Sequence, residues 1–164
     1  MKRLVILRHA KAEKEPTRRA DFERALTARG ESDALEMGRR LAAHRLRPDA
    51  IVASPARRAL ETAKIVAREL DFPWKTIRLE KQAYLADPET LLDLVRECPH
   101  DVETLFLVGH NPGVSELAQT LVRSFAEELP TCAAAAIDCA ADTWAGVRPG
   151  CGRLRWYEVA RNRG

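Results

Sequence analysis

Short runs rich in Leu, Ile and Val alternate with longer segments of mixed polarity along the chain as far as Pro130. Runs of this length and composition are typical of strands buried on both faces of a parallel sheet. They predict strands over Lys2–Leu7, Asp49–Ala53, Thr76–Leu79 and Glu103–Val108.

The segments between these runs carry apolar residues at helical spacing. In the first segment Leu35, Met37 and Leu41 stand among Arg, Glu and Ala residues, as on a helix with one buried face. The same reasoning predicts helices over Thr27–Arg45, Pro55–Leu70, Pro88–Glu97 and Val114 to about Glu127. Ser54 would supply a capping hydroxyl to the second helix, with Pro55 at its first position.

Beyond Pro130 the pattern changes to two strand-like runs, Ala133–Ala140 and Arg153–Val159, separated by a loop around Gly146–Gly152. They predict an antiparallel pair at a sheet edge. Strands that alternate with helices favour a three-layer α/β/α sandwich with a mainly parallel central sheet and an antiparallel edge strand. The length of 164 residues fits a single domain, 1–164.

Composition narrows the class of protein. The chain is 46% hydrophobic and 31% charged, as a folded globular protein is. Its 27 basic and 24 acidic residues nearly balance, and aromatic residues make up only 5%, which disfavours a nucleic-acid binder. The opening apolar run, Leu4–Leu7, is far shorter than a signal peptide core or a membrane span of about 20 residues. We therefore expect a cytoplasmic protein that associates with no membrane.

The four cysteines suggest neither a disulfide framework nor a zinc site. None of them forms a C-x-x-C pair, and no secretory feature accompanies them. We expect Cys98, Cys132, Cys139 and Cys151 to be reduced thiols.

Candidate chemistry lies at three strand ends. In open α/β sheets ligands bind beyond the carboxyl ends of the strands. The first strand continues into Arg8-His9, the second into Ser54–Arg58, and the fourth into Gly109–Asn111. Two Arg side chains can grip a tetrahedral phosphate, and helix N-termini add amide donors, so these segments predict an anion site.

A histidine in such a site can serve as a nucleophile if a backbone carbonyl holds its second ring nitrogen. His9 and His110 stand at strand ends, whereas His44 and His100 lie in polar contexts and receive no role. A metal site built from His9, His110 and Asp21 is disfavoured, because two Arg in the same cluster would repel a cation. We expect neither a metal nor another cofactor.

Four spaced motifs resemble those of the histidine phosphatase superfamily, which has the phosphoglycerate mutase-like fold. They are Arg8-His9 after the first strand, Ser54–Ala63 (SPARRALETA) and Val108–Val114 (VGHNPGV), to which Asp21–Gly30 adds a similarity to small SixA-type phosphohistidine phosphatases. Alignment on R-A-x-x-T-A makes Arg58, rather than Arg57, the phosphate ligand.

The resemblance implies a mechanism. His9 would attack phosphorus and carry the phosphoryl group, while Arg8, Arg58 and His110 hold its oxygens. Arg24 and Asn111 would help to bind the substrate, and inorganic phosphate or oxyanions such as vanadate and tungstate would inhibit.

Two residues are candidates for the proton donor. Glu80 lies approximately where the superfamily commonly has a proton-donating Glu, and Asp21 is the other candidate. Asp21 could equally be a partner that orients Arg24 or Arg58. A phosphohistidine substrate lessens the need for an acid, because its leaving imidazole, with a pKa of about 6.5, can be protonated beforehand.

The leading functional hypothesis is a phosphatase that acts on phosphohistidine in another protein. Short segments between the predicted elements leave no room for a large lid, and they imply a shallow site that a protein side chain can enter. Two alternatives stay open: a phosphatase of a small phosphorylated metabolite, and a non-catalytic phosphate-binding module. The sequence predicts neither the physiological substrate nor the oligomeric state.

Overall fold

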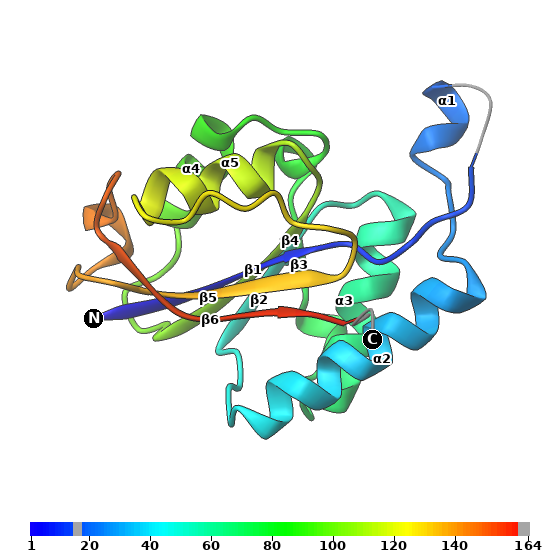
Figure 1. Ribbon diagram of the computed structural model, residues 1–164, viewed down its shortest axis with the longest axis horizontal. Coiled ribbons are helices and arrows are strands. Elements are labelled where there is room, and N and C mark those ends of the chain that lie inside the picture. The colour runs from blue at the N-terminus through cyan, green and yellow to red at the C-terminus, as the bar shows by residue number, and fades with distance from the viewer. Residues whose placement is uncertain (15–17, 161–164) are drawn as a thin grey trace.

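The computed structural model of the chain describes residues 1–14 and 18–160. A six-stranded sheet with the order β3-β2-β4-β1-β5-β6 forms the centre of the molecule (Figure 1). The strands are β1 (Lys2–Arg8), β2 (Ala50–Ala53), β3 (Arg78–Leu79), β4 (Thr104–Gly109), β5 (Ala133–Cys139) and β6 (Gly152–Val159).

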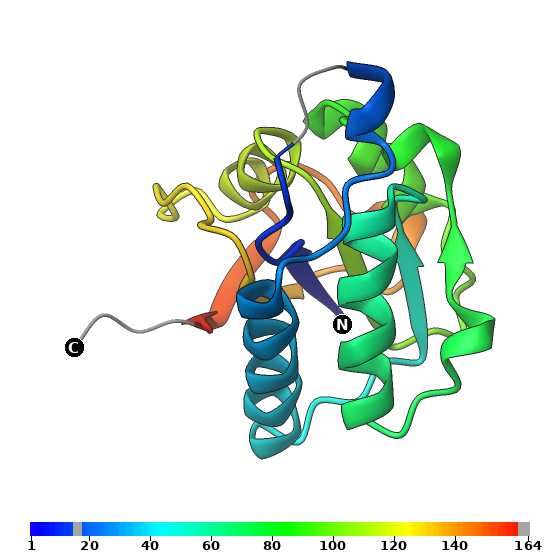
Figure 2. The ribbon, with the colours of Figure 1, turned by 90° about the vertical axis from the view of Figure 1, so that its right-hand side faces the viewer.

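Helices cover both faces of this sheet, which confirms the three-layer α/β/α prediction. Helices α2 (Ala28–Ala43) and α3 (Arg57–Glu69) lie side by side on one face (Figure 2). Helices α4 (Pro88–Arg96) and α5 (Gly113–Leu121) cover the other face (Figure 1). In the described ranges, no helix is long and apolar enough to cross a membrane.

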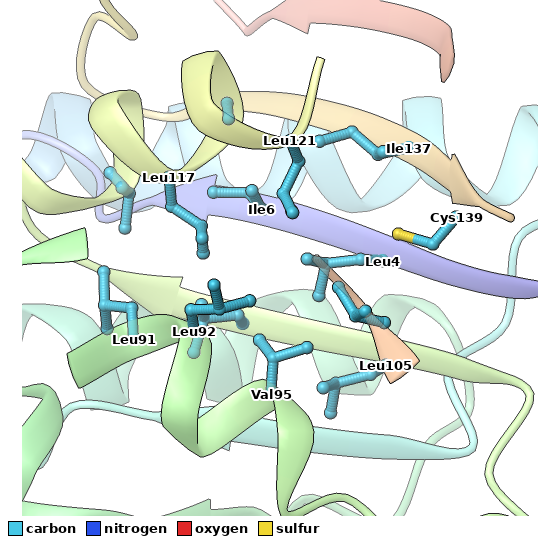
Figure 3. Packing of buried hydrophobic residues seen from close by; sticks show 14 of the residues in the cluster. Leu4, Ile6, Leu91, Leu92, Val95, Leu105, Leu117, Leu121, Ile137 and Cys139 are labelled. Carbon is cyan, nitrogen blue, oxygen red and sulfur yellow. The ribbon is translucent and has the colours of Figure 1, made fainter. Parts of the chain in front are cut away.

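The strand β1 shows why this sequence needs two helical layers. Leu4 and Ile6 pack with α4 and α5, and Val5 and Leu7 belong to the cluster on the α2 and α3 side. All four side chains are fully buried. Figure 3 shows the cluster that contains Leu4 and Ile6, in which side chains of β1, β4 and β5 pack against those of α4 and α5. Because successive side chains of a strand point to opposite faces of the sheet, β1 contributes to both hydrophobic clusters.

The final two strands confirm the predicted antiparallel pair. β5 runs antiparallel to β1 on one side and to β6 on the other, and β6 forms the sheet edge. The remaining pairings, β1 with β4, β4 with β2 and β2 with β3, are parallel.

Three predicted helix boundaries were wrong. The helix predicted to end at Arg45 ends at Ala43. The helix predicted from Val114 to about Glu127 ends at Leu121, because Val122 adopts an extended conformation. The helix predicted from Pro55 begins at Arg57, and Ala56 caps it without a side-chain hydrogen bond. Ser54 does not cap this helix, because its hydroxyl accepts from the Ala56 amide and contacts His110 instead.

Several short elements were not predicted. They are α1 (Arg18–Asp21) and the 3-10 turns η1 (Trp74–Thr76), η2 (Lys81–Ala83) and η3 (Trp144–Gly146).

The strand order places three carboxyl ends next to one another. β4 lies between β1 and β2, with Arg8 paired to Gly109 and Ala53 paired to Val108. The pairing continues past the strand ends, since the His9 amide donates to the Gly109 carbonyl and the Ser54 amide donates to that of Val108. The chain segments that carry the candidate site are therefore held at fixed distances by backbone hydrogen bonds.

Candidate active site

An open pocket lies beyond the carboxyl ends of β1, β2 and β4. The structure brings Arg8, His9, Arg58 and His110 together there, as the sequence predicted. Its described lining also includes Lys11, Ala12, Lys14, Asp21, Arg24, Leu85, Asn111 and Thr131.

His9 is held in one orientation and one tautomer. Its Nδ1 lies 2.7 Å from the Ala10 carbonyl oxygen, which can only accept a hydrogen bond. The proton of the neutral ring therefore resides on Nδ1, and Nε2 keeps its lone pair. Thr62 fixes this segment further, because its hydroxyl accepts from the Ala10 amide and donates to the Arg58 carbonyl.

Burial keeps both histidines neutral. Burial lowers the pKa of His9 to about 4, with a further contribution from the charges of Arg58 and Arg8. Burial also lowers the pKa of His110 to about 3, and the nearby His9 and Arg58 act in the same direction. The two ring centroids are 5.2 Å apart, so both imidazoles face the same small volume.

Arg58 and Arg57 point in different directions, as consecutive residues on a helix must. Arg58 is 1% exposed, and its Nη1 and Nη2 donate to the backbone oxygen and to Oδ2 of Asp21 at 2.7 and 3.0 Å. Arg57 is exposed and pairs with Glu61. The geometry agrees with the sequence register that assigned Arg58 to the pocket.

Asp21 accepts hydrogen bonds from three side chains. Arg58 and Arg24 donate to its two carboxylate oxygens, each at 3.0 Å, and the Tyr84 hydroxyl donates to Oδ2. Burial acts to raise the pKa of Asp21, but the hydrogen bond from Tyr84 and the charge of Arg58 outweigh it and hold that pKa below its usual value. Asp21 is therefore ionised at neutral pH.

His110 is positioned by Ser54 and Tyr84. The Ser54 hydroxyl lies 2.7 Å from Nε2 of His110 and accepts from the Ala56 amide. The hydroxyl donates to Nε2 or accepts from it, according to which ring nitrogen of neutral His110 carries the proton. The Tyr84 ring packs edge-on against His110, with the centroids 5.5 Å apart. Sequence reasoning missed both contacts, and no local motif marks Tyr84.

Three nitrogen atoms in this site are buried without a hydrogen-bond partner among the described residues: Arg8 Nε, Arg58 Nε and His110 Nδ1. A buried polar nitrogen without a hydrogen-bond partner destabilises the fold unless a ligand supplies that partner. All three residues line the same pocket, so a tetrahedral oxyanion can accept from each of them.

Asn111 and Arg24 line the pocket but hold neighbouring residues. The Asn111 amide donates to the Leu129 carbonyl at 2.8 Å and accepts from the Ser115 hydroxyl. Arg8 also donates to that Leu129 carbonyl, at 3.0 Å, so the loop after α5 helps to orient Arg8. Arg24 pairs with Asp21 and donates to the Glu13 carbonyl.

Glu80 lies outside the described lining of this pocket. Its carboxylate pairs with Arg78 at 2.9 Å, and both residues line a different hollow beside β2.

The residues that the structure describes include no group of three or more His, Cys, Asp or Glu that could hold a metal ion. The positive charge at the site comes from Arg8, Arg24 and Arg58, together with Lys11 and Lys14. The four cysteines are free thiols.

The direction of each guanidinium predicts unequal effects of two neighbouring substitutions. We expect Arg58→Ala to weaken vanadate or tungstate binding at least 100-fold and Arg57→Ala less than threefold, because charge-assisted hydrogen bonds to an oxyanion are each worth about 1.5–3 kcal/mol. Calorimetric titration of both variants measures this. Equal losses of oxyanion affinity in the two variants would contradict the assignment of Arg58, rather than Arg57, to the pocket.

The lowered pKa values predict the protonation state of the free protein. We expect His9 and His110 to keep the ¹⁵N chemical shifts of neutral rings as the pH falls from 7 to about 5, with the proton of His9 on Nδ1. Protonation should begin only as the pH approaches about 4. Titration of either ring near its ordinary value of about 6.5 would contradict the described burial.

Comparisons with known proteins agree with the geometry. The family model of the histidine phosphatase superfamily (branch 1) matches residues 4–82. An uncharacterized protein of Mycobacterium tuberculosis (strain H37Rv) is 33% identical over 165 residues, which cover 94% of this chain and all of that protein. An uncharacterized chloroplastic protein of Arabidopsis thaliana is 28% identical and matches 87% of this chain and 69% of its own length.

Solved structures show the same fold. A protein of Agrobacterium tumefaciens assigned as the phosphohistidine phosphatase SixA has a TM-score of 0.80 and 26% identity, over 96% of this chain and 97% of its own. The histidine phosphatase SixA in complex with tungstate has a TM-score of 0.82 and 19% identity, over 96% and 97% of the two chains. With the family match and the 33% identical relative, these likenesses show that the chain belongs to the histidine phosphatase superfamily and has the fold of its SixA-type structures.

Proposed function

We propose that this chain hydrolyses phosphohistidine on a partner protein, without a metal ion, through a phosphorylated His9. The observation that carries the proposal is the environment of His9. Its unprotonated Nε2 shares a pocket with two buried guanidinium donors and a buried ring nitrogen of His110 that have no described hydrogen-bond partner. An imidazole with a free lone pair is a nucleophile, and the unpartnered donors fit the oxygens of a phosphoryl group.

In the first step, the Nε2 lone pair of His9 attacks phosphorus in line with the leaving group. A P–N bond to His9 forms, and the bond to the leaving group breaks with its electron pair. Arg8, Arg58 and His110 hold the three equatorial oxygens, where charge is spread in the transition state. His9 then carries a positive charge, because both of its ring nitrogens are substituted.

In the second step, water attacks the phosphorus of this intermediate. The P–N bond breaks, its electron pair returns to Nε2, and inorganic phosphate leaves with the oxygen of water. The Ala10 carbonyl accepts from Nδ1–H throughout, which keeps the ring in the orientation needed for both steps.

Asp21 acts in this proposal as a positioning residue for Arg58. An ionised carboxylate that accepts from two Arg side chains and Tyr84 has no proton to donate. A substrate that departs as neutral imidazole brings its own proton, whereas an alkoxide needs an acid. The ionised state of Asp21 therefore supports phosphohistidine as substrate.

The rim of the pocket also supports a protein substrate. Lys11 and Lys14 are exposed at this open pocket. The fold is also similar to that of the mycobacterial glucosyl-3-phosphoglycerate phosphatase, with a TM-score of 0.69 and 15% identity. A small-metabolite phosphatase is therefore the alternative against which the substrate preference is tested.

The nucleophile role predicts that His9→Ala abolishes turnover. We expect less than a hundredth of the wild-type kcat on a phosphohistidine-bearing phosphotransfer protein, with His100→Ala, an exposed histidine, as the matched control. Circular dichroism checks that both variants fold. Residual activity above a hundredth would remove His9 from this role. Wild-type preference for sugar phosphates over phosphohistidine would favour the metabolite alternative.

The positioning role of Asp21 predicts equal losses on different leaving groups. We expect Asp21→Asn to lower kcat/KM by a similar factor, about tenfold or more, on phosphohistidine and on an alkyl phosphate, because Arg58 serves both substrates. Steady-state kinetics on the two substrates measures the ratio. A loss confined to the alkyl ester would instead identify Asp21 as the proton donor.

A further inference from the structure

Leu85 combines two unfavourable features at the rim of the pocket. Its backbone has a φ of 51°, in the left-handed region that residues other than Gly, Asn and Asp rarely adopt. Its side chain is 51% exposed, although it is a large apolar group. A strained conformation that persists beside a binding site is a reason to look for a function.

Tight contacts on either side hold Leu85 in this conformation. The preceding residue, Tyr84, is fixed by its hydrogen bond to Asp21 and by edge-on packing against Phe22 and His110, with centroid distances of 5.1 and 5.5 Å.

The following residue, Ala86, lies against the start of α5. Its carbonyl oxygen is so close to Gly113 that a Cβ there would lie 2.0 Å away. Next along the chain, Asp87 caps α4 by accepting from the Thr90 amide at 2.8 Å. Leu85 therefore connects two anchored residues, and the left-handed turn directs its side chain to the pocket.

The side chain differs in kind from the groups that would hold a phosphoryl group. The groups proposed to contact the phosphoryl group are Arg8, Arg58 and the two histidines. An oxyanion has no favourable interaction with the isobutyl group of Leu85. Leu85 lines the same open pocket, so it is available to whatever is attached to the phosphorus.

We propose that Leu85 is a specificity residue that packs against the apolar face of the leaving group and favours flat rings, such as the imidazole of phosphohistidine, over hydroxyl-rich groups. An imidazole presents its polar atoms at the ring edge and an apolar face to a neighbour. A sugar or glycerol moiety in the same place would lose water from hydroxyl groups to which Leu85 offers no hydrogen bond. The inference rests on the proposed phosphatase function, which it deepens.

The test uses Leu85→Asn and Leu85→Gly, since both residues accept the left-handed conformation. Leu79→Asn is the matched control, because Leu79 is an exposed leucine on β3 outside the described lining of the pocket. For each protein, kcat and KM are measured with free phosphohistidine, phenyl phosphate and glycerol phosphate, and Tm is measured by calorimetry.

Both Leu85 variants should lose about tenfold in kcat/KM on phosphohistidine and phenyl phosphate, mainly through KM, because one apolar contact discriminates by about that factor. On glycerol phosphate the change should stay within twofold. Tm should not fall, because Gly and Asn relieve the strained backbone. Leu79→Asn should leave all three kcat/KM values within twofold of the wild type.

Equal losses of kcat/KM on all three substrates, or no loss on any, would overturn the specificity role. A fall in Tm in both Leu85 variants would show that the left-handed leucine stabilises the fold, and would contradict the inference that it is retained for the pocket. Failure of the wild type to hydrolyse phosphohistidine would contradict the proposed function alone, since the comparison of phenyl with glycerol phosphate still tests Leu85.

Discussion

The parallel pairing of β1 with β4 is the constraint on which the site depends. It sets Arg8 opposite Gly109, and its continuation from the His9 amide to the Gly109 carbonyl fixes the backbone of the proposed nucleophile relative to that of His110. Because β2 pairs with the other side of β4, the same ladder places Ser54 within hydrogen-bond distance of His110. If β1 slipped by one residue, the side chains of Arg8 and His9 would each turn to the face of the sheet opposite the one they now occupy.

Buried nitrogens without a described partner make the candidate site costly to the stability of the ligand-free fold. Arg58 is buried with its Nε unpartnered, and the pKa values of His9 and His110 are lowered so that neither adds positive charge. Asp21 balances the guanidinium of Arg58 on the side that its terminal nitrogens face. An oxyanion that accepted from Nε of Arg58 would supply its missing partner, and would stabilise the folded state by the general linkage between binding and folding.

Much of this structure could be predicted from the sequence because it depends on local pattern. Apolar runs marked the strands, and the approximately 100° between consecutive helical residues separated Arg58 from Arg57. The end of α5 at Leu121 was missed because the following loop is held by distant partners, Arg8 and Asn111, which bond the Leu129 carbonyl. Tyr84 escaped detection for the same reason: its partners Asp21 and His110 are far away in sequence. Glu80 matched the expected position of an acid, yet it lies outside the pocket and pairs with Arg78.

In the proposed mechanism the phosphoryl group passes through Nε2 of His9, the nitrogen that the Ala10 carbonyl leaves unprotonated. Rapid quenching of the enzyme during turnover, with ¹⁵N-labelled histidine and ³¹P–¹⁵N correlation spectroscopy at alkaline pH, measures this directly. We expect phosphorus bonded to Nε2 of His9 and to no other nitrogen. Phosphorus on Nδ1 or on another residue, or single-step transfer to water with inversion at phosphorus, would contradict it.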